Sequence, residues 1–260
     1  MPGALTVVRQ HESLGAAADL DFALGMLDAA RCGQLGPTLR IYRPLPTVAL
    51  GQRDARLPGF AAAADACRRH GFEPLVRRAG GRAAAYHSDC LILDHVEPDA
   101  ASLTGARRRF ADFGTLLAGA LEKAGLQAGV GEIPGEYCPG EFSVYGEGPA
   151  GDRIKLVGTA QRVVAGAWLF SSVVVVGNSA PLRSVLTDCY AELELDWDTR
   201  TAGAARDLAP ELGLADVEDA LVQAYGGLTA AGDGDFNLLR QNVTQHRPAG
   251  ASCRQSPGLG

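Results

Sequence analysis

The sequence predicts an α+β fold in which helices flank a mixed β-sheet, although an α/β arrangement of the same elements stays open. Three observations support this prediction. Helical and short strand patterns alternate in the first hundred residues, a run of strand patterns follows, and helical patterns return near the end. The 260 residues, 47% of them hydrophobic, are enough to bury one large core.

The first hundred residues predict two helices separated by short strands. Ala23 and Leu27 lie on one face of the first helix, which Ser13 would cap. Pro58 suits the first turn of the second helix, and Gly71 ends it. The expected elements are a helix over 13–30, strands over 39–43 and 47–51, a helix over 58–70, a strand over 74–78, a small-residue strand after residue 81, and a strand over 90–96.

The rest of the chain predicts a long helix, a run of strands and two further helices. Phe110, Phe113 and Leu117 recur at helical spacing, which is typical of a helix that faces the core. Residues 229–260 are polar and lack periodicity, so we expect a mobile tail after a folded domain of residues 1–228. The expected elements are a helix over 106–125, strands over 130–133 and 142–145, a hairpin of 153–164 and 167–176, and helices over 181–193 and 215–225.

The charge balance and the apolar runs exclude several classes of protein. A net charge of −6 and a pI near 5.4 argue against a nucleic-acid partner, and the three arginines at 107–109 are expected on a solvated helix face. The N-terminus lacks the basic and apolar regions of a signal peptide. The longest apolar run, 163–177, is too short to cross a membrane. We therefore expect a cytoplasmic protein without a membrane partner.

The cysteines and histidines give no indication of a metal or a bound cofactor. Six cysteines are widely spread without CxxC spacing, which argues against a zinc site and against a disulfide scaffold. His95 follows Asp94, but no third ligand stands at metal-binding spacing. The sequence therefore predicts chemistry carried by side chains alone.

One segment, Arg-Arg-Ala-Gly-Gly-Arg-Ala-Ala-Ala-Tyr-His, combines paired arginines with a double glycine. Gly80 and Gly81 let backbone amides approach a ligand closely, and Arg77 and Arg78 can neutralise a carboxylate or a phosphate. His87 ends the segment, where it would line a pocket. The alternative is a β-hairpin in which the two glycines serve only the turn.

A cysteine in a Pro/Gly turn is the strongest candidate nucleophile. Cys138 stands in Tyr-Cys-Pro-Gly rather than in a periodic apolar segment, and Lys155 lies on the following expected strand. A nearby cation favours the thiolate, which is the form of cysteine that attacks carbonyl groups. Together the two residues predict an acyl-transfer centre, whereas each one alone is more often structural.

These segments together resemble a known superfamily. The arginine–glycine segment, with Tyr86 and His87 at its end, is similar to the Arg-Arg-x-Gly-Gly-Gly-Ala…Tyr-His motif of the biotin/lipoate protein ligases and octanoyltransferases. Lys155 in Lys-Leu-Val-Gly-Thr-Ala-Gln-Arg is similar to their Lys-x-x-Gly-x-Ala-Gln signature. Tyr-Cys-Pro-Gly-Glu-Phe at 137–142 resembles the nucleophile segment of the cysteine-dependent octanoyl/lipoyl transferases. The resemblance covers residues 10–225.

The resemblance implies a biotin/lipoate ligase-like core and a two-step acyl transfer in protein lipoylation. Cys138, with Lys155 as its base, would attack an octanoyl or lipoyl carbonyl and pass the acyl group to the lysine of a lipoyl domain. The donor would be an acyl carrier protein or a lipoyl domain like the glycine cleavage H protein, without ATP. The implied substrate-binding residues are Arg77, Arg78, Gly80, Gly81, Tyr86, His87, Gly158, Thr159 and Ala160. The expected lining of an apolar acyl tunnel is Val76, Ala83, Ala85 and Val157.

Two departures from the motif bear on the alternatives. Arg82 stands where the motif has its third glycine, so we expect its side chain to intrude into the loop, and Ser-Asp-Cys-Leu at 88–91 replaces the usual Asp-x-Gly-Asn. Both argue against an ATP-dependent lipoate–protein ligase, in which Cys138 would be incidental. The other alternative is a non-catalytic lipoyl- or biotinyl-binding protein, which would have no need of both Cys138 and Lys155.

Overall fold

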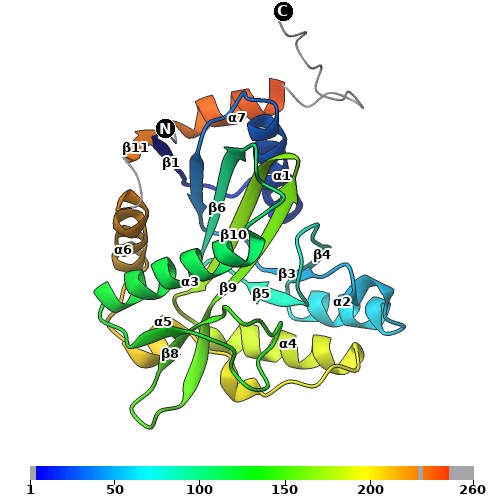
Figure 1. Cartoon of the computed structure of the whole chain (residues 1–260). Helices are drawn as coiled ribbons and strands as arrows, with labels where there is room; N and C mark the ends of the chain where they lie inside the picture. The colour runs from blue at the N-terminus through cyan, green and yellow to red at the C-terminus, as the bar shows by residue number, and fades with distance from the viewer. Residues whose placement is uncertain (1–3, 228–230, 246–260) are drawn as a thin grey trace, which may run out of the picture.

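The computed structural model describes residues 4–227 and 231–245 and has the predicted class, α+β with a mixed sheet (Figure 1). Its elements in chain order are β1 (Leu5–Gln10), α1 (Ala16–Arg31), β2 (Thr38–Tyr42), β3 (Thr47–Leu50), the 3₁₀ turn η1 (Asp54–Arg56), α2 (Phe60–Arg69), β4 (Glu73–Val76), β5 (Ala84–Tyr86), β6 (Cys90–Asp99), α3 (Ala106–Lys123), β7 (Ala128–Val130), β8 (Val144–Glu147), β9 (Arg153–Val164), β10 (Gly166–Val175), α4 (Ser179–Glu192), η2 (Thr199–Thr201), α5 (Ala205–Leu208), α6 (Leu214–Gly226), β11 (Ala231–Gly234) and α7 (Phe236–Gln245).

A large sheet and a small sheet organise the chain. The strand order of the large sheet is β11-β1-β2-β6-β10-β9-β8-β7, and that of the small sheet is β4-β3-β5. β11, β1 and β2 pair in parallel, and the strands from β2 to β7 pair antiparallel, which makes the large sheet mixed. The predicted hairpin of residues 153–176 is confirmed as β9–β10, with Gly166 at a φ of +92° in its turn.

Helices cover both faces of the large sheet (Figure 1). On one face, Leu93 and Phe170 belong to the core that α3 and α6 close. On the opposite face, Val96 and Leu169 pack with α1 and α7. Farther along this second face, Ile92 packs with the small sheet, α2 and α4. Because successive residues of a strand point to opposite faces, the same strands supply all three clusters.

The structure differs from one alternative and from one expectation of the sequence analysis. β4 and β5 do not form a hairpin, because both pair with β3, so the double-glycine segment crosses the end of β3 instead of making a tight turn. The expected mobile tail contains β11, which pairs with β1, and α7, whose Leu239 and Val243 belong to the same buried cluster as Phe22 of α1. Positions 228–230 and 246–260 of that tail lie outside the described residues.

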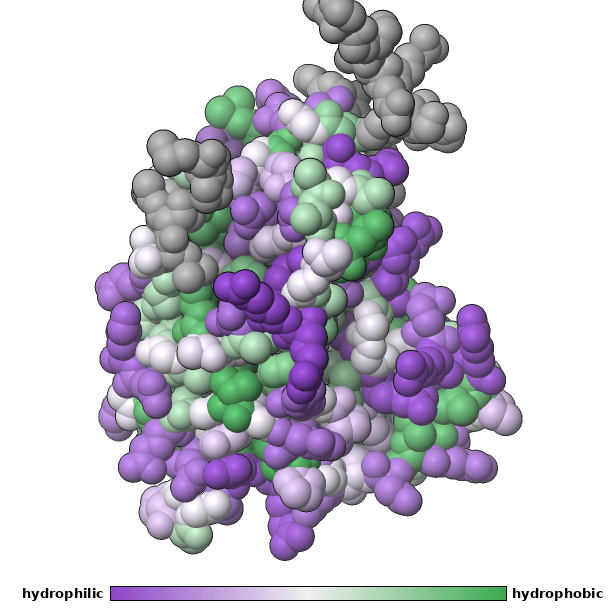
Figure 2. All heavy atoms as spheres, viewed as in Figure 1, coloured by the Kyte–Doolittle hydropathy of each residue, from purple (hydrophilic) through white to green (hydrophobic). Residues whose placement is uncertain are grey.

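Hydrophilic side chains predominate on the face shown in Figure 2, with apolar ones in scattered groups. Within the described part of the chain, the large apolar side chains with the most exposed surface are Leu45, Val76, Leu103 and Leu238. No helix in this part is both long and apolar enough to pass through a bilayer.

A buried arginine ties α1 to the large sheet. Arg40 is fully buried, pairs with Asp19 Oδ1 at 3.0 Å, and lies 3.8 Å from Asp94 Oδ2. Its guanidinium also stacks on the ring of Tyr42, 4.0 Å from the centroid. Ser13, which we expected to cap the first helix, instead donates a hydrogen bond to Asp19. Burial raises the pKa of the Asp94 carboxyl, and Arg40 opposes this effect.

We expect Asp19→Ala to lower the free energy of unfolding by about 3–5 kcal/mol, because it leaves a buried guanidinium without its closest carboxylate. Asp28→Ala is the matched control on the same helix: Asp28 pairs with Arg31 at 3.4 Å, but its side chain is 64% exposed. That change is expected to cost less than about 1 kcal/mol. Urea unfolding followed by circular dichroism measures both, and equal losses would contradict the role given to Asp19.

Candidate active site

A cavity of about 550 Å³ lies between α1, the segment 76–81, the segment 137–143 and one face of the large sheet. Leu20 and Leu24 line it from α1. Neighbouring strands are paired so that their lining residues share one face. The sheet contributes Tyr42, Ile92, Asp94, Gly158, Ala160, Leu169, Ser171 and Val173, among others. The mixture of apolar walls and a few polar groups is typical of a site for a small ligand.

The expected acyl tunnel is displaced by one residue along two strands. Val76 lines the cavity as expected, but Ala84 and Gly158 line it in place of their neighbours. The residues that point elsewhere, into the core, are Ala83, Ala85 and Val157. Because side chains alternate between the faces of a strand, choosing the wrong face moves every expected contact by one position.

Cys138 lines this cavity from the loop that joins β7 to β8, in a strained conformation. Its φ of +44° is uncommon for a residue other than glycine and costs on the order of 1–3 kcal/mol. Tyr190 of α4 holds the backbone there, because its hydroxyl accepts the Cys138 N–H at 2.8 Å and donates to the Ala83 carbonyl at 3.0 Å. One tyrosine thus fixes the Cys138 loop against the segment that precedes β5.

Lys155 holds the same loop from the side of β9. Its Nζ donates to the carbonyls of Tyr137 at 3.1 Å and Cys138 at 2.8 Å, and it pairs with Glu136 Oε2 at 2.8 Å. The Lys155 side chain is 3% exposed, and that of Glu136 is fully buried. The structure therefore brings Lys155 to the backbone of the predicted nucleophile.

Glu136 is a site residue that the sequence interpretation missed. Besides Lys155, its carboxylate accepts hydrogen bonds from the N–H groups of Ile133 and Gly140 and from the hydroxyl of Ser143. A carboxylate directly before Tyr-Cys-Pro-Gly, in a turn otherwise built from apolar residues, glycine and proline, was the available signal. Its bonds span the loop on both sides of Cys138.

The sulfur of Cys138 faces the double-glycine segment. The backbone N–H of Arg82 donates to Sγ at 3.1 Å, and Arg77 Nη2 donates to it at 3.6 Å. Gly81 makes this approach possible: its φ is +101°, and a Cβ at this position would stand 2.8 Å from Sγ and 2.4 Å from Arg77 Nη2. The predicted residues Arg77, Gly81 and Cys138 therefore meet at one point.

Arg82 does not intrude into the cavity, contrary to our expectation. Its guanidinium turns towards η1 and pairs at 2.9 Å with Asp54, whose side chain is fully buried. Asp54 also accepts the N–H of Gly51 at 2.8 Å. The arginine in place of the third glycine thus anchors the segment from outside the cavity, because a buried carboxylate from a distant turn draws it there.

The family model of the lipoyl protein ligase A/B catalytic domain matches residues 17–225. This chain belongs to that family. It is 27% identical over 231 residues to the octanoyl-GcvH:protein N-octanoyltransferase of Geobacillus kaustophilus, a match that covers 82% of this chain and 80% of the relative. The protein of the same name from Exiguobacterium sibiricum is 28% identical over 230 residues, covering 81% and 78%.

Solved structures share the fold of this family. A lipoate-protein ligase A bound with ATP superposes with a TM-score of 0.69 over 94% of this chain and 93% of its own, at 18% identity. A putative lipoate protein ligase of Thermoplasma acidophilum with bound lipoic acid gives a TM-score of 0.68 at 17% identity and covers 94% and 93% of the two chains. The predicted superfamily and the ligase-like core are confirmed.

The other residues that the resemblance to this family implied fall into two groups. Those that line the cavity are Arg78, Gly80, Tyr86, Gly158, Thr159 and Ala160. His87 is buried outside the lining: its Nδ1 accepts the N–H of Asp89 at 3.0 Å, so its Nε2 carries the proton and donates to the carbonyl of Asn178 at 2.9 Å. In this structure His87 supports the segment between β5 and β6.

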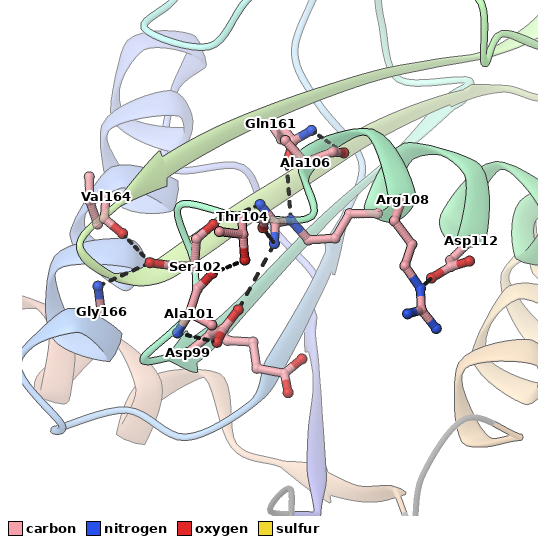
Figure 3. A network of polar contacts seen from close by, with 12 residues as sticks. Asp99, Ala101, Ser102, Thr104, Ala106, Arg108, Asp112, Gln161, Val164 and Gly166 are labelled. Atoms are coloured by element: carbon pink, nitrogen blue, oxygen red, sulfur yellow. Dashed lines mark hydrogen bonds and ion pairs between the residues drawn. The ribbon is translucent and has the colours of Figure 1, made fainter.

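The glutamine of the family signature Lys-x-x-Gly-x-Ala-Gln joins β9 to the start of α3 (Figure 3). Gln161 Nε2 donates to the Ala106 carbonyl at 2.8 Å, and Arg109 Nε donates to Gln161 Oε1 at 3.1 Å. The Arg109 side chain is only 12% exposed, whereas that of Arg108 is 86% exposed. The expected solvated face therefore holds for Arg108 and is wrong for Arg109, because Gln161 and loop carbonyls bind its guanidinium.

Residues 4–227 and 231–245 contain no group of three or more histidine, cysteine, aspartate or glutamate side chains placed to hold a metal. His95 packs edge-on against the rings of Phe113, Trp168 and Tyr225. Burial lowers the pKa of His95 to about 3, so its imidazole is neutral at physiological pH. His95 is therefore a core residue.

Gly81→Ala is expected to lower the melting temperature by about 3–6 °C, because the new methyl group would be strained at positive φ and would collide with Cys138 and Arg77. Gly80→Ala is the matched control, because its Cβ would meet nothing within 4 Å and its φ is not positive. We expect a change of less than about 2 °C for this control. Scanning calorimetry measures both, and equal shifts would refute the packing described at Gly81.

Proposed function

We propose that this protein transfers an octanoyl or lipoyl group to the lysine of a lipoyl domain, in protein lipoylation, through an acyl-Cys138 thioester. The observation that carries the proposal is the sulfur of Cys138, which lines the cavity and accepts hydrogen bonds from Arg82 N–H and Arg77. The relatives named octanoyltransferases, which match more than three quarters of this chain, support the reaction class.

In the first step the Cys138 thiolate attacks the acyl carbonyl of the donor, a new C–S bond forms, and the donor's thiol or amine leaves. The donor is an acyl carrier protein or a lipoyl domain similar to the glycine cleavage H protein. The N–H of Cys138 already donates to Tyr190. We therefore assign the developing oxyanion to the backbone amides of Gly80 and Gly81, which line the same cavity.

In the second step the neutral ε-amine of the acceptor lysine attacks the acyl-cysteine, the new C–N bond forms, the C–S bond breaks, the Cys138 thiolate leaves, and the amine proton passes to solvent. Both steps exchange one acyl bond for another, so no ATP is consumed. Leu20, Leu24 and Ile92 give the cavity an apolar wall that suits an eight-carbon chain. Octanoyl and lipoyl groups share that chain length, and Arg78, Tyr86, Thr159 and Ala160 are proposed to contact the bound substrate.

Lys155 enters this proposal as a positioning residue. An ammonium group has three N–H donors, and here they face two carbonyls and a carboxylate. A neutral amine has only two donors, so the observed geometry fits the charged form. To act as a base, Lys155 would have to lose one of these hydrogen bonds. The catalytic Cys138–Lys155 dyad therefore stays a prediction.

An ATP-dependent lipoate–protein ligase is the second candidate. The observation that favours it is the side chain of Arg82, which leaves the double-glycine segment unobstructed. In that reaction the acyl group would be activated as an adenylate, and Cys138 would form no thioester.

Incubation of the purified protein without ATP, with octanoyl-acyl carrier protein or with an octanoylated lipoyl domain, is expected to add about 126 Da, the mass change when an octanoyl group replaces the thiol hydrogen. Intact-mass spectrometry measures the adduct, and Cys138→Ser should not form it. The donor that works identifies the partner. Pyrophosphate release from lipoate and ATP without an adduct would favour the ligase, and neither adduct nor ATP turnover would favour a binding protein.

A further inference from the structure

The positive charges around Cys138 are not equivalent. Lys155 pairs with the buried carboxylate of Glu136 at 2.8 Å, and Arg82 pairs with the buried carboxylate of Asp54 at 2.9 Å. Arg77 forms no ion pair with a carboxylate of the described residues. Of these three cations at the nucleophile, Arg77 is therefore the one whose charge is not already matched.

The side-chain contacts of Arg77 point to the sulfur as the missing counter-charge. Nη2 donates to the Arg82 carbonyl at 2.7 Å and to Cys138 Sγ at 3.6 Å, while the buried Nε has no hydrogen-bond partner among the described residues. The Arg82 carbonyl is neutral. A guanidinium that is partly buried and lacks a carboxylate is costly unless an anion lies beside it.

The surroundings of the sulfur fit an anion. Sγ accepts hydrogen bonds from the Arg82 N–H at 3.1 Å and from Arg77 Nη2. Both groups are donors only, so both stabilise a thiolate, which is an anion and the stronger acceptor, more than they stabilise a neutral thiol. A Cβ at Gly81 would stand 2.8 Å from Sγ and 2.4 Å from Arg77 Nη2, so only glycine lets these two groups meet.

We propose that Arg77 is the catalytic cation of this site, paired with the Cys138 thiolate before the acyl donor binds. This inference rests on the proposed acyl transfer and assigns its activating group to Arg77 instead of Lys155. The thiol proton is lost to solvent in the resting enzyme. With a thioester donor, the Sγ–carbonyl bond then forms and the donor's C–S bond breaks, so one thiolate enters and one leaves. No base is needed for this step.

The test is the rate at which iodoacetamide alkylates Cys138 between pH 6 and about 10, measured by peptide mass spectrometry with Cys138→Ser as background. Arg77→Gln is expected to slow the reaction at pH 7 about tenfold or more. The wild type and the variant should converge at about pH 10, where a cysteine ionises without help. A loss by the same factor at every pH would mean that Arg77 only shapes the loop, and would overturn the proposal, as would an unchanged rate.

Two further variants sharpen this measurement. Arg77→Lys keeps the positive charge, so its rate at pH 7 should lie between those of the wild type and Arg77→Gln; a rate equal to that of Arg77→Gln would count against a role for the charge. Arg108→Gln removes one charge at a position 86% exposed on α3 and should leave the rate within about twofold. If Arg108→Gln slowed alkylation as much as Arg77→Gln does, the effect of Arg77 would be explained by the net charge of the protein, and the proposal would be overturned.

Alkylation needs no acyl donor, so its outcome is separate from that of the acyl-enzyme experiment. An octanoyl adduct on the wild type, together with unchanged alkylation of Arg77→Gln, would keep the proposed function and remove this inference. A slowed, pH-dependent alkylation without any adduct would keep the Arg77–Cys138 pair and remove the acyl transfer.

Discussion

The buried carboxylate of Glu136 is the group on which the geometry of the site depends. It binds Lys155 and accepts hydrogen bonds from Ile133 N–H, Gly140 N–H and Ser143 Oγ, so one charge organises a loop that has no regular secondary structure. A buried ion pair contributes little net stability, because desolvation offsets most of the attraction. The role of this pair is to fix the conformation of the loop. It helps to hold Cys138 at a positive φ, which a residue other than glycine rarely adopts unless its surroundings impose it.

The second half of the site comes from sheet topology. β4 and β5 both pair with β3, so the segment that carries Arg77 and Gly81 must cross the end of that strand. Tyr190 then binds this segment through the Ala83 carbonyl and the Cys138 loop through its N–H. Two loops that lie 61 residues apart at the Arg77–Cys138 contact are thereby held by one small sheet and one helix.

The parts of the fold that local sequence determines were predicted well, and the parts that depend on distant partners were not. The α3 stripe and the β9–β10 hairpin follow from periodicity and a tight turn. The helix α7 was missed although Phe236, Leu239 and Val243 have helical spacing, because polar residues dominate its composition. The orientation of the Arg82 side chain depends on its ion pair with Asp54, 28 residues away, and no local sequence pattern predicts such a pair. The motifs predicted which segments line the cavity, whereas the partners of Glu136 and the face of each strand could be identified only from the tertiary structure.

The different chemistry of ammonium and guanidinium explains why one site contains both. The ammonium of Lys155 is a compact charge with three donors, and here they are directed at two carbonyls and a carboxylate, which makes it an anchor. The guanidinium of Arg77 is planar, and its Nη2 reaches a backbone carbonyl and the sulfur at once, so the same group orients the glycine segment and faces the nucleophile. Glu136 pairs with Lys155, whereas no carboxylate of the described residues pairs with Arg77. We therefore attribute the positive potential at the sulfur chiefly to the guanidinium. Lys155 binds the backbone of the Cys138 loop, and Arg77 contacts Sγ. A substitution of Lys155 would therefore change the position of the loop, whereas a substitution of Arg77 would change the positive charge beside Sγ.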